Sequence, residues 1–147
     1  MNVFSKILCP IDFDRDSMEA LDLAALIARQ NSAEILLLAV VAAPIDAAIE
    51  LPPVPLNPDS PFENEYLRRL EKLGQEKLAG IPHRSLVASG NAAPQILKLI
   101  ADSNVDLIIM GTHGRKGVKH FLLGSVAERV VRESPVPVLT VRPTPAE

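Results

Sequence analysis

The stretch DLIIMGTHGRKGVKHFLLGS, residues 106–125, joins an apolar run to a glycine-rich loop and then to the start of another segment. The run Val105–Met110 is almost wholly apolar and stops at a glycine, which is typical of a buried strand. The segment Ser125–Glu133 is predicted to form a helix. A buried strand, a loop and a helix in this order are the repeating unit of an α/β fold.

The rest of the chain repeats this alternation. The predicted strands are Ile7–Ile11, Ile35–Val41, a weak strand from near His83 to Ala88, Val105–Met110 and Val136–Val141. Four helices are predicted between these strands. The first starts at Asp16, the second carries Phe62, Tyr66, Leu70 and Leu73, the third has Pro94 in its first turn, and the fourth spans Ser125–Glu133. Such a chain forms a parallel sheet with helices on both faces, and its 147 residues make one domain. Ligands of these folds bind beyond the carboxyl ends of the strands, here after Ile11, Val41 and Met110.

One segment interrupts the alternation, because residues 44–61 contain six prolines among 18 residues. Loops of this length are either functional or tolerated insertions. Two interpretations follow: a stiff surface insertion, or a flap over the site at the end of the second strand.

Composition narrows the class of protein. Apolar residues make up 48% of the chain and charged residues 22%, so a real core is expected. The net charge of -3 argues against a general nucleic-acid or anionic-membrane binder. A single cysteine excludes an internal disulfide, and no apolar run reaches the length of a membrane span or a signal peptide. We therefore expect a cytoplasmic protein without membrane or nucleic-acid partners.

The glycine-rich loop has the chemistry of a phosphate site. Glycines let successive N–H groups approach an anion, and the start of the following helix favours one as well. From Leu107 to Ala127 there are three bases, Arg115, Lys116 and Lys119, and no acid. A mobile surface loop with solvated lysines is the alternative. The glycine spacing fits neither the P-loop nor the G-x-G-x-x-G pattern.

The spacing Gly111-x-x-Gly114, nine residues, then Gly124-Ser125 resembles the G-2x-G-9x-G-[ST] pattern of the nucleotide-binding universal stress proteins. Lys6–Asp12 and Asp106–Gly111 are similar to the first and fourth strands of that family. Leu123–Glu128 and Pro135–Leu139 are similar to its last helix and last strand. The resemblance therefore extends along the whole chain, residues 1–147.

The resemblance implies a Rossmann-like sheet of strand order 3-2-1-4-5 that binds ATP or a related adenine nucleotide, with or without Mg. It implies that Asp12 holds the ribose or the adjacent polar part of the nucleoside. The implied adenine-lining residues are Pro10, Val40 or Val41, and Met110. The implied ribose and phosphate contacts are Gly111, Gly114, Gly124, Ser125 and Val126, with the polar loop residues His113, Arg115 and Lys116 beside them.

Each assignment has a structural alternative. Asp12 could simply begin the turn before the first helix. Ser125, three residues before Glu128, completes a capping-box pattern and could cap the last helix. Met110 and Val41 could be core residues. Cys9 is expected to be an inert, buried residue. The histidines, His83, His113 and His120, lack the spacing of a metal site, and none is predicted.

Three functions remain open. The first is a stress-response regulatory protein that binds ATP with little or no turnover. The second is a slow ATP-hydrolysing enzyme, although the loop lacks the carboxylates that magnesium needs. The third is a relative that acts through protein contacts alone, with a partner that the sequence does not identify. A homodimer through the edge strand Val136–Val141 is also expected, because both faces of that strand are largely apolar.

Overall fold

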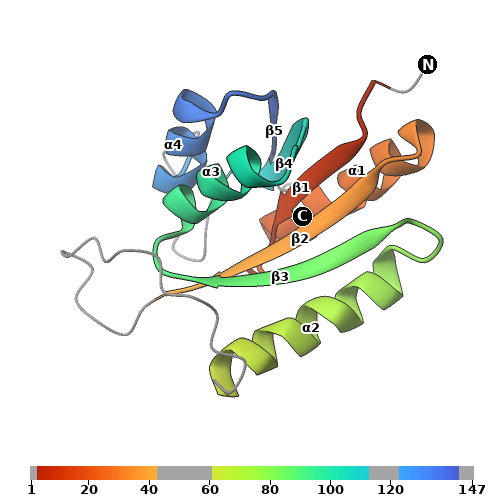
Figure 1. Ribbon diagram of the computed structural model, residues 1–147, viewed down its shortest axis with the longest axis horizontal. Coiled ribbons are helices and arrows are strands. Elements are labelled where there is room, and N and C mark those ends of the chain that lie inside the picture. The colour runs from red at the N-terminus through yellow and green to blue at the C-terminus, as the bar shows by residue number, and fades with distance from the viewer. Residues whose placement is uncertain (1–2, 43–60, 113–122, 143–147) are drawn as a thin grey trace, which may run out of the picture.

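The computed structural model describes residues 3–42, 61–112 and 123–142, and its centre is a five-stranded sheet (Figure 1). The strands are β1 (Lys6–Pro10), β2 (Glu34–Val41), β3 (His83–Ser89), β4 (Leu107–Gly111) and β5 (Val138–Val141). Every neighbouring pair is parallel, and the order is β3-β2-β1-β4-β5. The predicted fold class and strand order are confirmed.

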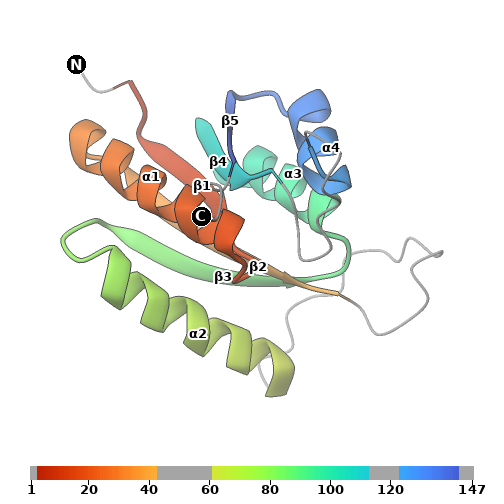
Figure 2. The ribbon, with the colours of Figure 1, turned by 180° about the vertical axis from the view of Figure 1, so that it is seen from behind.

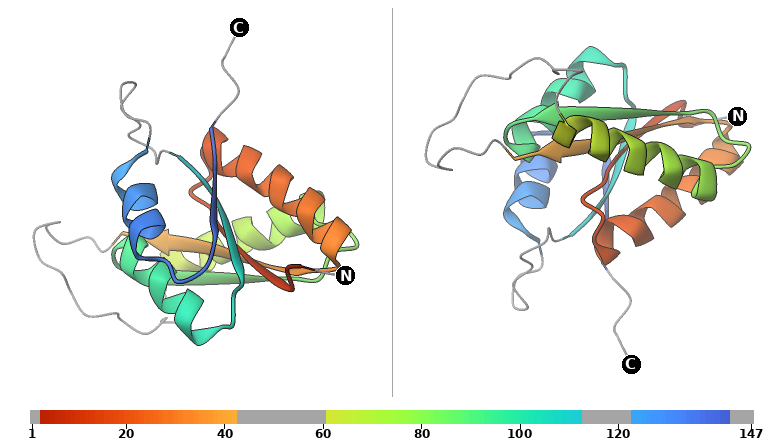
Figure 3. Two further views of the ribbon diagram at one scale, coloured as in Figure 1. Left: turned by 90° about the horizontal axis from the view of Figure 1, so that it is seen from above. Right: turned by 90° about the horizontal axis from the view of Figure 1, so that it is seen from below.

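Helices connect the strands and cover both faces of the sheet (Figures 2 and 3). They are α1 (Arg15–Asn31), α2 (Pro61–Lys77), α3 (Ala92–Asp102) and α4 (Ser125–Glu133). One core cluster joins α1 and α2 to residues such as Ile7, Leu37 and Ile109. A second cluster joins α3 and α4 to alternate residues of the same strands, such as Leu8 and Ile108. Because successive side chains of a strand point to opposite faces of the sheet, each strand contributes alternate residues to the two clusters.

Burial on both faces explains why the central strands read as continuous apolar runs. Ile7, Leu8 and Cys9 are successive residues of β1 and are all 0% exposed. In β2 the fully buried run is Ile35, Leu36 and Leu37. Since helices cover both sides, no polar position alternates with the apolar ones.

The strands β1, β2 and β4 are shifted by one or two residues from their predicted bounds, and three further boundaries also differ from the sequence prediction. β5 begins at Val138, not Val136, because Pro137 has no N–H for the ladder; its carbonyl still accepts the Ile108 N–H at 3.0 Å. Pro61, the last residue of the proline-rich segment 44–61, is the first residue of α2, where its missing N–H costs nothing, and the rest of that segment, with its two interpretations, lies outside the described residues. The N-cap of α1 is Asp14, with extended backbone, and Asp16 lies inside the first turn.

None of the helices in the described ranges combines the length and the apolar character needed to cross a lipid bilayer.

Candidate functional site

The carboxyl ends of the strands meet at one edge of the sheet, and β1 is the strand that stops early there. Pro10 ends β1 opposite Leu38, whereas β2 continues to Val41 and β4 continues to Gly111. The chain also winds outward from β1 in both directions, because β2 and β4 flank it. The switch point of the sheet therefore lies beyond Pro10, where a ligand of this fold class would bind.

Asp12 lies just beyond β1, and its carboxylate is held in a fixed orientation. Its Oδ1 accepts hydrogen bonds from the Asp14 N–H at 2.9 Å and from the Ser17 hydroxyl at 2.8 Å. The Asp12 N–H points back to the Ser17 Oγ at 3.3 Å. Ser17 is only 4% exposed, so this is a buried, directional contact. The result is a pre-oriented carboxylate at the switch point.

Phe13, the next residue, turns the chain sharply. Its φ of 65° is in the left-handed region, which is rare for a bulky side chain. The Arg69 guanidinium of α2 lies 3.9 Å from the centre of the Phe13 ring, and the Tyr66 ring centroid lies 5.9 Å away. These contacts from α2 offset the cost of the strained backbone. They also connect α2 to the segment that carries Asp12.

Gly111, at the end of β4, is required by close packing. A Cβ built on Gly111 would lie 2.6 Å from the Asp16 Cβ and 2.9 Å from its backbone carbon. Only glycine lets the end of β4 approach the first turn of α1 this closely. Gly111 therefore has a structural role, whatever it contributes to a ligand.

Thr112 follows Gly111 and joins three elements. Its N–H donates to the Val141 carbonyl of β5 at 3.2 Å, and its carbonyl accepts the Gly124 N–H at 2.6 Å. Its hydroxyl donates to the Asp16 carboxylate of α1 at 3.3 Å. Thr112 is 2% exposed. It fixes where the chain leaves β4 and where it returns to begin α4.

The start of α4 lies beside the end of β4, because the Gly124 N–H donates to the Thr112 carbonyl. Gly124 is the N-cap, and the first intrahelical bond is donated by the Glu128 N–H to the Gly124 carbonyl at 2.9 Å. The earlier N–H groups, including those of Ser125 and Val126, have no intrahelical acceptor. The capping-box interpretation of Ser125 is wrong, because Ser125 is already the first helical residue and is exposed.

The apolar candidates divide between the two faces of the sheet. Val40 and Met110 pack in the cluster of α3 and α4, together with Val126. Pro10 points to the same side by strand alternation from Leu8. Val41 packs in the opposite cluster, with α1 and α2. The structure thus brings together Pro10, Val40 and Met110 on the face of α4, and it separates Val41 from them.

Four of the predicted site residues, His113, Gly114, Arg115 and Lys116, lie outside the described residues. So does His120, whereas the remaining candidates are placed as above.

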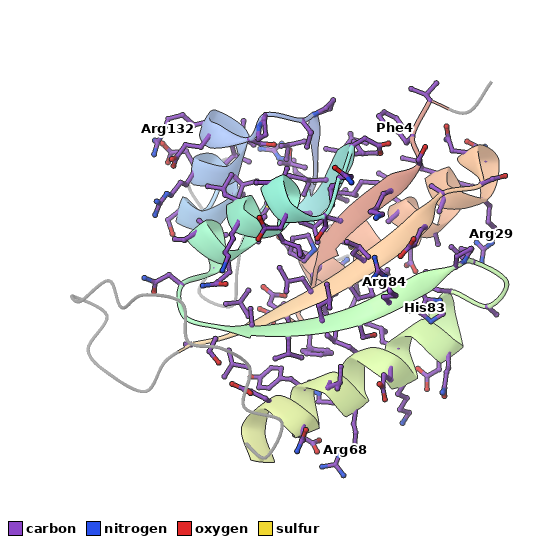
Figure 4. The ribbon with its side chains drawn as sticks, in the orientation of Figure 1. Phe4, Arg29, Arg68, His83, Arg84 and Arg132 are labelled. Carbon is purple, nitrogen blue, oxygen red and sulfur yellow. The ribbon has the colours of Figure 1, made fainter. Side chains whose placement is uncertain are left out.

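Two side chains with reactive groups serve packing. Burial raises the pKa of the Cys9 thiol from 9.0 to about 12, which keeps it protonated and inert as predicted. His83 lies between β3 and α2 (Figure 4). Its Nδ1 is 2.7 Å from the Ile81 carbonyl oxygen and therefore carries a proton. The His83 ring packs directly against Gly74, since a Cβ built on Gly74 would lie only 2.6 Å from the Nε2 of the ring.

Sequence reasoning missed the two hydroxyls that organise this edge. Ser17 and Thr112 are the buried polar residues of the described part of the chain, and each donates to an acid of the segment Asp12–Asp16. A serine five residues after the predicted ribose ligand was a local signal for the first contact. The second contact joins positions 96 apart in the sequence, so no local pattern carries it.

Residues 4–142 match the model of the universal stress protein family. Universal stress protein MJ0531 of Methanocaldococcus jannaschii is 33% identical over 147 residues, covering 96% of this chain and 84% of that protein. Universal stress protein YxiE of Bacillus subtilis is 32% identical over 149 residues, covering 95% of this chain and 100% of that protein.

Solved structures agree with the fold. The structure of MJ0577, which served for a structure-based assignment of its biochemical function, has a TM-score of 0.70 at 30% identity, covering 97% of this chain and 99% of that chain. A universal stress protein in complex with cAMP has a TM-score of 0.72 at 20% identity, covering 96% and 98% of the two chains. A family member from Arabidopsis thaliana with AMP bound has a TM-score of 0.63 at 16% identity, covering 95% and 92%.

Proposed function

This chain belongs to the universal stress protein family, and we propose that it binds an adenine nucleotide, ATP or a close relative, at the carboxyl edge of its sheet. The observation that carries the proposal is that the fixed Asp12 carboxylate follows the end of β1, while α4 starts from Gly124, which is hydrogen-bonded to Thr112 at the end of the neighbouring strand β4. One group accepts hydrogen bonds and the other donates them. A nucleotide needs an acceptor for its ribose hydroxyls and donors for its phosphate oxygens. The solved relatives that hold cAMP and AMP support the same ligand class.

The nucleoside part fits the face shared with α4. Asp12 would accept hydrogen bonds from the ribose hydroxyls, with its carboxylate oriented by Ser17. The adenine would lie against Pro10, Val40 and Met110, three apolar groups on one side of the sheet. Val40 suits this role better than Val41, whose side chain lies on the opposite face.

The phosphates would lie toward α4. The N–H groups of Ser125 and Val126 precede the first intrahelical bond, and the helix dipole adds partial positive charge there. Gly124 adds no side chain at the start of α4, whereas the missing Cβ of Gly111 faces Asp16 of α1. The loop residues proposed to complete this side are His113, Gly114, Arg115 and Lys116. A magnesium ion accompanying the nucleotide would find the carboxylates of Asp12 and Asp14 across the site.

We propose a regulatory role in the stress response, in which the bound nucleotide is hydrolysed slowly or not at all. Fast phosphoryl transfer requires carboxylates and a group that positions the nucleophile beside the terminal phosphate. The segment from Leu107 to Ala127 contains no acid. A cytoplasmic location and a protein partner that responds to the bound state belong to the same proposal.

Titration calorimetry with ATP, ADP, AMP, GTP and adenosine tests the binding. Asp12→Ala should weaken ATP and adenosine by a similar factor, because a charged hydrogen bond to ribose is worth roughly 1.5–3 kcal/mol, about tenfold or more. Asp22→Ala is the matched control, since Asp22 is an acid of the α1 surface paired with Lys77. Gly124→Val should abolish binding and leave the fold intact.

The absence of both heat and thermal stabilisation with every adenine nucleotide at millimolar concentration would refute the proposal. A loss confined to ATP in Asp12→Ala, with adenosine unchanged, would instead assign Asp12 to magnesium and favour the ATP-hydrolysing alternative.

We also propose a homodimer through β5. This strand lies at the end of the sheet order, and Leu139 is 39% exposed on it. Apolar edge strands favour pairing with another chain. Leu139→Lys should therefore yield a folded monomer by light scattering. Val131→Lys, at an exposed apolar residue of α4, is the matched control and should leave the mass unchanged. A monomeric parent protein, or a folded Leu139→Lys dimer, would remove β5 as the interface.

A further inference from the structure

Thr112 makes contacts to several elements at the end of β4, and these contacts indicate a role that does not require it to touch the ligand. The residue lies where the chain leaves β4, and it is 2% exposed although its side chain is polar. Burying a hydroxyl is costly unless it is hydrogen-bonded, and the bond here runs to the Asp16 carboxylate of α1. We propose that Thr112 is a positioning residue for the phosphate side of the nucleotide site. This inference rests on the proposed function.

The backbone of Thr112 sets the position of α4. The Thr112 carbonyl accepts the N–H of Gly124, the residue that caps α4, at 2.6 Å. The two ends of the glycine-rich loop are therefore joined by a direct hydrogen bond. A displacement of the Thr112 peptide would displace the start of α4, and with it the N–H groups that we assign to the phosphates.

The same peptide is attached on its other side to the edge of the sheet. Its N–H donates to the Val141 carbonyl of β5 at 3.2 Å. The two backbone bonds thus join the Thr112 peptide to β5 and to the start of α4. The hydroxyl adds an attachment to α1, on the opposite face. Thr112 thus links the two helical layers across the end of β4, and its hydroxyl is the link to α1.

This arrangement separates the two halves of the proposed site. The carboxylate of Asp12 is oriented by Ser17 and by the Asp14 N–H, and neither contact passes through Thr112. Loss of the Thr112 hydroxyl should loosen the phosphate side alone. The affinity for a nucleoside without phosphates should therefore stay unchanged, whereas the affinity for ATP should fall. This difference distinguishes positioning of α4 from general destabilisation.

Thr112→Val removes the hydroxyl and keeps the shape. Calorimetric affinities for ATP and for adenosine are measured on the same preparation, together with the free energy of unfolding in urea. We expect a roughly threefold to tenfold loss of ATP affinity, the range of a single modest hydrogen bond, and unchanged adenosine affinity. Thr112→Ser, which keeps the hydroxyl, should bind both ligands as the parent does.

Ser89→Ala is the matched control. Ser89 also ends a strand at this edge, and its hydroxyl donates to the Glu63 carboxylate of α2 at 2.6 Å. It makes the same kind of bond without any contact to α4, so both affinities should be unchanged. Equal losses of ATP and adenosine affinity in Thr112→Val would overturn the inference, and so would an unchanged ATP affinity.

A double-mutant cycle keeps the inference testable if Thr112→Val folds poorly. Asp16→Ala removes the acceptor and keeps the Cβ that packs on Gly111. The cycle with Thr112→Ala and Asp16→Ala should give a non-additive change in ATP affinity, because each substitution removes one partner of the same bond. Additive changes would overturn the inference. A parent protein that binds no ATP would instead refute the proposed function itself, so the two failures are distinguishable.

Discussion

Cys9 makes a quantitative prediction for alkaline pH. Its thiol is fully buried in β1, and burial raises its pKa from 9.0 to about 12. Below pH 9 the thiol is protonated in both the folded and the unfolded chain, so it adds no pH dependence. Above pH 9 the unfolded chain ionises first, which favours unfolding until the folded thiol also ionises near pH 12. Between pH 8 and pH 10 this linkage should cost about 1.4 kcal/mol of stability.

Other groups titrate over the same range, so the prediction concerns a difference between two proteins. The Cys9→Ala variant leaves a cavity, and the resulting loss in the free energy of unfolding does not depend on pH. Urea unfolding of both proteins at pH 8, 9 and 10 should show the parent losing about 1.4 kcal/mol more than the variant. The folded parent should also react with a thiol reagent only as fast as it unfolds. Parallel pH profiles, or rapid labelling of the folded parent, would refute the reasoning.

Three further substitutions test the edge of the sheet. Gly111→Ala should lower the free energy of unfolding by about 1–3 kcal/mol in urea, because its Cβ would overlap Asp16; a variant as stable as the parent would contradict the packing role. Ser17→Ala should weaken ATP and adenosine alike in calorimetry, since the Asp12 carboxylate loses its 2.8 Å donor; a loss for ATP alone would contradict this. Arg69→Ala should cost about 0.5–1 kcal/mol of stability by losing the stack on Phe13, and an unchanged urea midpoint would show that the stack contributes nothing.

The sheet could be predicted from the sequence because most of its strands are buried on both faces. Ile7–Cys9 and Ile35–Leu37 are uninterrupted apolar runs, and such runs have few other stable structures. The edge strand β5 was predicted two residues too long. Val136 and Pro137 continue its apolar pattern, but a proline cannot donate to the ladder. Apolar character alone does not locate a strand boundary.

The site could be predicted only in part, because its geometry depends on register. Val40 and Val41 are adjacent and chemically identical, so sequence reasoning could not choose between them. The pleat of β2 separates them, and only Val40 shares a face with Met110 and α4. Thr112 was missed for a similar reason. Its partner Asp16 belongs to another helix and lies 96 residues away, where no local spacing applies.

The acids of the segment after β1 present an electrostatic problem that these hydroxyls help to resolve. Asp12, Asp14 and Asp16 lie near the place where we propose phosphates, and like charges at close range repel. Two of the three carboxylates accept bonds from buried hydroxyls, Asp12 from Ser17 and Asp16 from Thr112. All three also lie at the start of α1, whose dipole favours negative charge. Carboxylates held in this way have part of their charge compensated by fixed donors, and so the anion site that we propose at the start of α4 can remain attractive to a nucleotide.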